Sequence, residues 1–148
     1  MKTFPFVALL AGLVLSLAPG ARAQVTAMPG TGCPGVAPPN VVGPPSHSST
    51  FQIDCGPADS DTLCLQPPVL LVGGCLPGAL PILPPLGCDP GCSLVVSPVY
   101  GTFASPLVLV PPSLPSGFTF CVQCGCIADY GVGACIELSE GITITMMP

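Results

Sequence analysis

The sequence has almost no basic side chains. Lys and Arg together number two among 148 residues, and both, Lys2 and Arg22, lie within the first 22 positions. Proteins bind nucleic acid by neutralising its phosphates with Lys and Arg, and binding to anionic membrane surfaces depends on the same side chains. Both partners are therefore poor candidates for the rest of the chain, where His47 is the only side chain able to become cationic.

The sequence also lacks tryptophan and any long helical pattern. It has no Trp, two Tyr and six Phe, so it offers few aromatic platforms for sugar stacking. No long window shows a helical apolar period free of proline and glycine, because 22 Pro and 18 Gly are spread along the chain. Proline removes a backbone donor and interrupts helices. We therefore expect essentially no helix after residue 23.

The first 23 residues have the pattern of an export signal. Lys2 supplies a positive charge, an apolar run follows, and Ala21-Arg22-Ala23 has the small-x-small form of a cleavage site. The apolar run is too short to span a bilayer, so we expect cleavage before Gln24 rather than a retained anchor. The mature protein is then secreted, to the extracellular space or to the periplasm and cell envelope, with no membrane association.

Cleavage at this site predicts complete resistance to trypsin. Trypsin cuts after Lys and Arg, and the residues from Gln24 onward contain neither. We expect the secreted protein to remain uncut even after denaturation and reduction, as measured by gel electrophoresis and mass spectrometry. Chymotrypsin, which cuts after aromatic residues, is the control for accessibility. Fragments produced by trypsin alone would contradict a mature start at Gln24.

All ten cysteines lie in the mature part, which favours disulfide bonds. An even number of cysteines in a small exported chain usually forms a disulfide framework, because the compartment is oxidising. Each closed loop then stabilises the fold by on the order of 3 kcal/mol in the chain-entropy account. The apolar content of 49% and the low charge indicate a compact domain, since disordered chains show the opposite balance.

Short apolar runs separated by turn residues predict an all-β fold. The runs are 50–54, 68–74, 93–97, 106–111, 117–127, 134–138 and 141–146. This spacing is typical of a β-sandwich, here a small disulfide-braced sandwich of about seven strands, and a barrel is the alternative. We expect a single domain over residues 31–148, preceded by flexible residues 24–30. Its first part, 31–49, is a proline- and glycine-rich leader pinned by Cys33.

Five short motifs give the mature sequence a family resemblance. They are TGCPG at 31–35, VLLVGG at 69–74, GCSLVVSP at 91–98, PSLPSGFTFCVQ at 112–123 and LSEG at 138–141. Their order resembles that of exported all-β domains of planctomycete-type and related bacteria, in which GCxLxxSP, PxLPxGxxxxxQ and LSNGxxxxI patterns recur. The resemblance covers about residues 31–148 and implies an exported β-domain, and it brings no catalytic residues. Two departures are Cys-Gly-Cys after Gln123, where the family has an aromatic-rich stretch, and a higher cysteine count. The customary SNG turn of the family is Ser139-Glu140-Gly141 here.

The densest cysteine cluster, Cys121, Cys124 and Cys126, also raises metal and redox alternatives. Structural zinc uses four ligands in closely spaced pairs, and a redox pair needs a thiol pKa lowered by a helix N-terminus or a cation. Only Cys121-Val-Gln-Cys124 has the pair spacing, on a predicted strand without basic neighbours. Disulfides remain the favoured interpretation. Because side chains alternate along a strand, Cys124 and Cys126 share one face and should bond to neighbouring strands, whereas Cys121 points to the other face.

Proximity along the chain suggests three candidate disulfides, and Cys33 with Cys92 is a fourth candidate, although the full connectivity stays open. Folding back through residues 128–133 would place Cys126 opposite Cys135. The other candidate pairs are Cys55 with Cys64, Cys75 with Cys88, and Cys33 with Cys92. Cys121 and Cys124 have no assigned partner in this scheme.

The acidic side chains and the single histidine offer few candidates for chemistry. Asp59 and Asp61 are candidate calcium ligands, but their stretch lacks the ligand spacing of an EF-hand. His47 lies in the leader, and no GxSxG or SxxK nucleophile motif is present. Glu137 and Asp129 form a candidate carboxylate pair, yet two acids beside a turn are usually solvated. We therefore expect no metal, no cofactor and no enzymatic activity.

An exported module with a structural or extracellular interaction role is the function that these observations favour. Its partner would be extracellular or part of the cell envelope. The alternative is a carbohydrate- or calcium-binding module that uses acidic loops such as 56–63, and an enzyme comes third.

Overall fold

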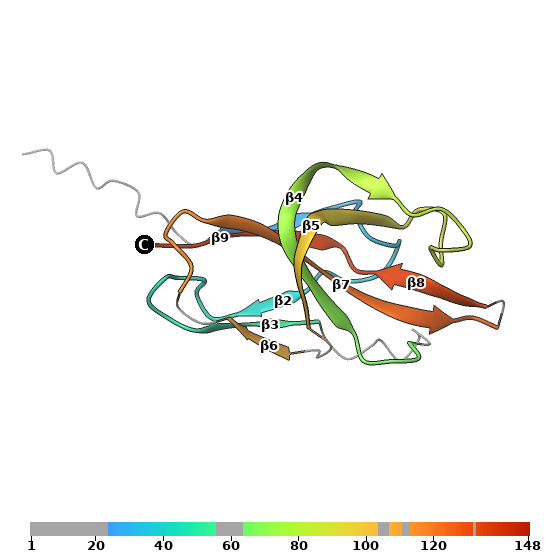
Figure 1. The fold of residues 1–148 in the computed structure, drawn as a ribbon, viewed down its shortest axis with the longest axis horizontal. Coiled ribbons are helices and arrows are strands. Elements are labelled where there is room, and N and C mark those ends of the chain that lie inside the picture. The colour runs from blue at the N-terminus through green and yellow to red at the C-terminus, as the bar shows by residue number, and fades with distance from the viewer. Residues whose placement is uncertain (1–23, 56–63, 104–106, 111–112, 132) are drawn as a thin grey trace, which may run out of the picture.

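All of the regular structure that the computed structural model describes is β-strand (Figure 1). The described residues are 24–55, 64–103, 107–110, 113–131 and 133–148. They form nine strands: β1 Gln24–Met28, β2 Asn40–Val42, β3 Phe51–Asp54, β4 Val69–Pro81, β5 Ser93–Phe103, β6 Leu107–Val110, β7 Thr119–Asp129, β8 Ala134–Leu138 and β9 Gly141–Thr145. No helix within these ranges is long and apolar enough to cross a membrane.

The strands form two antiparallel sheets. The larger sheet has the order β1-β9-β7-β4-β5 with β8 also paired to β7, and the smaller has the order β2-β3-β6. β7 is central to the larger sheet, because its first half pairs with β9, its second half pairs with β8, and β4 lies along its other edge. Residues 139–140 join β8 to β9 beside β7. The all-β sandwich expected from the sequence is confirmed.

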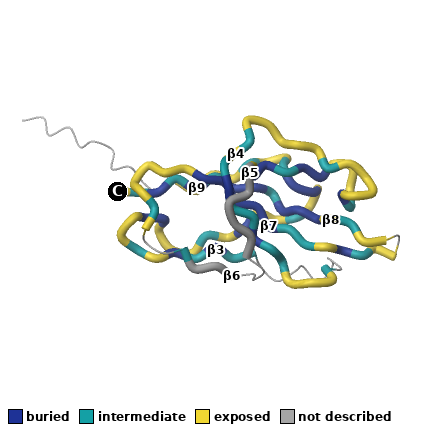
Figure 2. The backbone as a smooth tube through the Cα atoms, viewed as in Figure 1, coloured by how far each residue is buried: buried dark blue, intermediate teal, exposed yellow. Residues whose placement is uncertain are grey.

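The main core lies between the two sheets (Figure 2). Strand alternation produces it: in β9, Ile142 and Ile144 are buried, whereas Thr143 and Thr145 are only partly so. The buried members of this cluster are Phe51, Ile53, Leu70, Phe120, Val122, Cys124, Ile142, Ile144 and Met146. Burying one large apolar side chain is worth about 1.5–3 kcal/mol, so the cluster is a main source of stability beside the disulfides.

The second half of β4 leaves the sheet core and is exposed. The register between β4 and β5 shifts at Val72, Gly73 and Cys75, and paired glycines in a strand are typical of such irregularities. Residues 77–81 are exposed, as the curved upper segment in Figure 2 shows. Pro77 and Pro81 lie in this segment, where they discourage pairing with another chain.

Each of the seven expected strands has a counterpart, and two further strands were missed. β2 lies inside the proline-rich leader and pairs with β3. The expectation of a flexible segment at 24–30 is wrong, because residues 24–28 form β1 and pair in full with β9. Four of the five β1 residues are exposed. The strand therefore has no buried apolar face of the kind that a sequence pattern predicts. The hydrogen bonds of β1 to β9 hold it in place instead.

Candidate functional site

Three cysteines of β7 attach this strand to three other segments. The disulfides are Cys121–Cys75, Cys124–Cys55 and Cys126–Cys64. Cys124 and Cys126 share a face and bond the two ends of the segment 56–63, which lies outside the described residues. Cys121 points the other way and packs with Val95 and Val96. The alternation expected for this strand is confirmed, and these sulfurs are disulfide sulfurs rather than the thiolates that a metal or redox site requires.

All ten cysteines form disulfides, but three of the four expected pairs are wrong. Cys33–Cys92 is confirmed. The pairs Cys126–Cys135, Cys55–Cys64 and Cys75–Cys88 are replaced by Cys64–Cys126, Cys55–Cys124, Cys75–Cys121 and Cys88–Cys135. In the β7–β8 hairpin the cause is the register, because Cys126 lies opposite Glu137 and Cys135 lies opposite Ala128. Each hairpin cysteine therefore bonds to a segment that flanks the hairpin.

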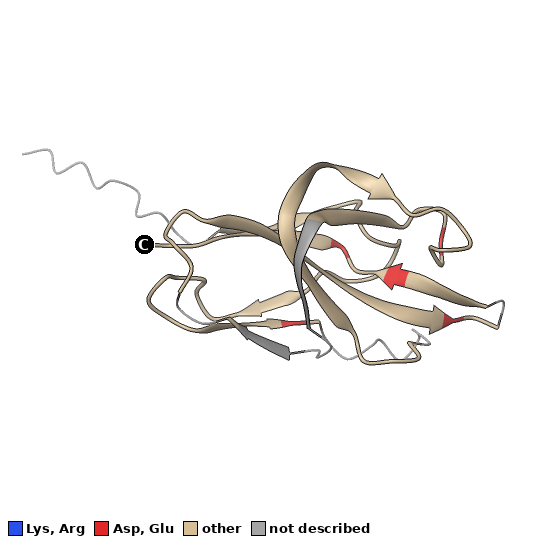
Figure 3. Cartoon of the chain, viewed as in Figure 1, with Lys and Arg blue, Asp and Glu red and all other residues tan. Residues whose placement is uncertain are grey.

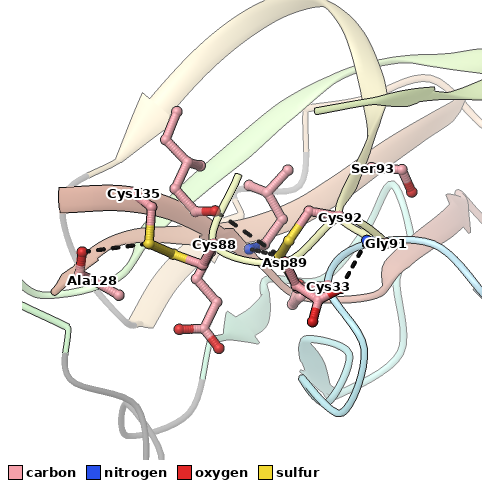
Figure 4. The surroundings of a disulfide bond; sticks show 12 residues. Cys33, Cys88, Asp89, Gly91, Cys92, Ser93, Ala128 and Cys135 are labelled. Carbon is pink, nitrogen blue, oxygen red and sulfur yellow. Dashed lines mark hydrogen bonds between the residues drawn. A yellow bond between two sulfur atoms is a disulfide. The ribbon is translucent and has the colours of Figure 1, made fainter. Parts of the chain in front are cut away.

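Two disulfides fix the turn at residues 88–92 (Figure 4). Cys88 is bonded to Cys135 of β8, and Cys92 is bonded to Cys33 of the leader. Between them, the N–H of Gly91 donates to Oδ1 of Asp89 at 2.7 Å, so this carboxylate closes the turn. The turn thus joins the leader to the β7–β8 hairpin.

Gln123 of β7 is a fully buried amide that connects two of the sequence motifs. Its Oε1 accepts a hydrogen bond from the N–H of Val95 at 3.1 Å. Its Nε2 donates to the carbonyl oxygens of Ser93 and Ser139, both at 2.9 Å. Both amide hydrogens and the amide oxygen are therefore used. Ser93 and Val95 belong to the motif at 91–98, and Ser139 belongs to the motif at 138–141.

The motif at 31–35 reaches the same place through its backbone and its threonine. The N–H of Cys33 donates to the carbonyl oxygen of Leu138 at 2.7 Å. The hydroxyl of Thr31 accepts a hydrogen bond from the N–H of Gly141 at 2.9 Å. Both contacts hold the leader against the corner between β8 and β9.

Gly32 lies at the closest approach between these motifs. It exchanges two backbone hydrogen bonds with Ser93, at 3.1 and 2.9 Å. Its φ is +74°, and a Cβ at this position would overlap the carbonyl group of Ser139. Four of the five sequence motifs therefore meet in one region, and the fifth, VLLVGG, lies on β4. We call it the motif cluster and define it as residues 31–33, 92–95, 123 and 138–141.

The charged side chains coloured in Figure 3 are all acidic, and Glu137 is the buried one among the described residues. Glu137 has an exposed fraction of 7%, in a region of the chain that has no Lys or Arg to pair with it. Its Oε2 accepts a hydrogen bond from the hydroxyl of Tyr130 at 2.9 Å. Burial raises the pKa of Tyr130 above its usual value, and the hydrogen bond to Glu137 and the charge of that carboxylate raise it further.

The contact between Tyr130 and Glu137 predicts a loss of stability at alkaline pH. A group whose pKa is raised on folding stabilises the fold fully below its unfolded pKa, about 10 for Tyr, and this contribution is lost as the pH rises through the folded value. We expect the melting temperature of the wild type to fall more steeply above about pH 10 than that of Tyr130→Phe, which has no hydroxyl to ionise. Circular dichroism melts over this range measure the difference. Parallel slopes would contradict the contact.

Asp129 and Glu137 do not form the carboxylate pair considered from the sequence. Asp129 accepts a hydrogen bond from the N–H of Gly131 at 2.8 Å in the hairpin turn. The strand register places its side chain and that of Glu137 on opposite faces of the β7–β8 pair. His47 is exposed, and its Nδ1 lies 3.3 Å from the carbonyl oxygen of Met147. Asp129, Glu137 and His47 therefore lie in separate parts of the structure and do not form a shared site.

One group of potential metal ligands occurs near Glu137. The sulfurs of Cys64 and Cys126 and a carboxylate oxygen of Glu137 lie within 4.8 Å of one another. The two sulfurs are bonded to each other, so only the carboxylate retains its ligand chemistry. Asp59 and Asp61, the candidate calcium ligands, lie outside the described residues.

The motif cluster has the chemistry of a structural brace. It contains backbone hydrogen bonds, the hydroxyl contacts of Thr31 and Ser139, one disulfide, and one buried amide whose polar atoms all form hydrogen bonds within the protein. Comparisons with protein-family models, with curated proteins and with solved structures found no match to this chain.

The structural role of Gln123 was not predicted from the sequence, where it was noted only as a motif residue. The available signal was one uncharged polar residue within the otherwise apolar stretch from 120 to 124.

Proposed function

We propose that this protein is an exported structural module that relies on covalent bracing to stay folded outside the cytoplasm. The observation that carries the proposal is the use of all ten cysteines in five disulfides. Such frameworks form and persist in oxidising compartments. The signal-like first 23 residues support the same location and a mature start at Gln24.

The motif cluster supports a scaffold role within this proposal. Residues that give the chain its resemblance to exported bacterial β-domains are used to hold the leader, β5, β7 and the β8–β9 corner together. The module then presents its outer surfaces to an extracellular or envelope partner. Its lack of basic side chains favours a partner other than nucleic acid.

Export and oxidation can be tested together in a bacterial host that expresses the full chain, including the signal-like residues 1–23. We expect the protein outside the cytoplasm, with no thiol that reacts with iodoacetamide before reduction. After denaturation and reduction all ten thiols should react, which is the internal control. Reactive thiols in an unprocessed cytoplasmic chain would overturn the proposal. A rise in melting temperature on addition of calcium would instead favour the calcium-binding alternative.

A further inference from the structure

We propose that Gln24, once it is the first residue of the exported chain, closes into a pyroglutamate and leaves the mature protein without a primary amine. This inference rests on the proposed export and on cleavage before Gln24. Gln24 is the first residue of β1, is exposed, and lies opposite Thr145 of β9. The chain from Gln24 onward contains no lysine, so the α-amine is its only primary amine.

The reaction is an intramolecular amide exchange. The uncharged α-amine nitrogen attacks the side-chain carbonyl carbon, Cδ, and the new C–N bond closes a five-membered lactam. The bond from Cδ to the side-chain nitrogen breaks, and that nitrogen leaves as ammonia with a proton from the amine. No oxidant, reductant or co-reactant is consumed. An α-amine has a pKa of about 7.7–8.0, so a substantial fraction is uncharged near neutral pH, and the two groups are held close because they belong to one residue.

β1 can carry the lactam without losing its place in the sheet. The first residue of a chain has no preceding peptide group, and the exposure of Gln24 leaves room for the ring. The lactam keeps one N–H, and the backbone carbonyl of Gln24 is unchanged. The rest of the strand, through Met28, keeps its register with residues 141–144 of β9.

Ring closure changes both the charge and the protease resistance of the module. With neither Lys nor Arg after residue 23, His47 becomes the only group able to carry a positive charge. Aminopeptidases that require a free α-amine can no longer begin at β1. This strand covers the edge of β9, whose Ile142 and Ile144 belong to the main core. The closed N-terminus therefore protects the strand at which stepwise digestion would otherwise start.

Mass spectrometry and amine labelling of the freshly exported full chain test the proposal. We expect an N-terminal peptide that begins at Gln24 and is lighter by one ammonia, and no labelling of the denatured protein by an N-hydroxysuccinimide ester. The matched control is Gln24→Asn, whose side chain is one methylene shorter and would need a strained four-membered ring. This variant should take one label per molecule.

Failure of the cyclisation and failure of the proposed cleavage before Gln24 give different results in these experiments. A wild-type peptide that begins at Gln24, keeps its ammonia and takes one label overturns the cyclisation and leaves export intact. A peptide that begins at another residue overturns the cleavage site, and the cyclisation with it. Pyroglutamyl aminopeptidase gives an independent readout, since it should remove the first residue of the wild type and create a new amine at Val25.

Discussion

Replacement of Gln123 by leucine is expected to lower the free energy of unfolding by about 2–6 kcal/mol. The change leaves the N–H of Val95 and the carbonyl oxygen of Ser139 without the partner that the buried amide supplies. Each buried polar group left unpaired costs about 1–3 kcal/mol. The carbonyl oxygen of Ser93 loses less, because it also accepts a hydrogen bond from the N–H of Gly32. Urea unfolding of the disulfide-intact proteins measures the difference.

Gln52→Leu is the matched control for this prediction. Gln52 lies on β3, is partly buried, and makes no side-chain hydrogen bond within the described part of the chain. The same chemical change should therefore alter stability by no more than about 0.5 kcal/mol. Equal losses in the two leucine variants would mean that the buried network around Gln123 contributes nothing specific.

Gln123→Glu separates hydrogen bonding from shape. Its carboxyl group would face the carbonyl oxygens of Ser93 and Ser139, so burial and these dipoles should raise its pKa on folding. The variant should be closest to the wild type below about pH 4.3, the unfolded pKa of Glu, and should lose stability as the pH rises above it. A deficit independent of pH would contradict the proposed geometry.

Gly32→Ala is expected to cost about 2–5 kcal/mol for a different reason. The residue has a φ of +74°, a left-handed conformation that costs other residues about 1–2 kcal/mol. The added Cβ would also overlap the carbonyl group of Ser139, and backbone atoms cannot move aside as a flexible side chain does. Relief of such overpacking typically costs about 1–3 kcal/mol more.

Gly35→Ala isolates the backbone part of this cost. Gly35 has a φ of +85°, belongs to the same motif, and has no atom within 4 Å of a Cβ placed on it. We expect a loss of only about 1–2 kcal/mol in the same unfolding experiment. If the two alanine variants were equally stable, the close approach of Gly32 to the β8–β9 corner would not exist in solution.

Strand positions were accessible from the sequence because most strands have a local signature. The run 134–138 coincides with β8, and 141–146 contains β9, because apolar residues bounded by turn residues mark both. β1 has no such signature, since its place is set by pairing with a distant strand and four of its residues face solvent. Local pattern therefore predicts strands that bury a face and misses an exposed edge strand.

Disulfide pairing could not be predicted from the sequence in the same way. The three wrong pairs joined cysteines close together in sequence, whereas every bond in the structure spans 46 to 69 positions. These bonds depend on which segments flank β7 and β8 across the sheet. That order is a property of the topology, which short motifs do not encode.

The role of Gln123 could not be predicted from the sequence for a related reason. Gln123 ends the motif at 112–123, but the residues that it binds, Val95, Ser93 and Ser139, belong to other motifs and lie 16 to 30 positions away. Only the fold brings them together. Four of the five motifs each supply one side of the motif cluster.

Disulfide mapping tests the central claim, that the cysteine-rich β7 segment is a covalent brace, most directly. Peptic digestion of the unreduced protein, followed by fragmentation of the cross-linked peptides, should show the peptide around 120–127 bonded to three separate peptides. These should carry Cys55, Cys64 and Cys75. A bond within the segment, between Cys121 and Cys124, or a peptide pair joining Cys55 directly to Cys64, would contradict the account.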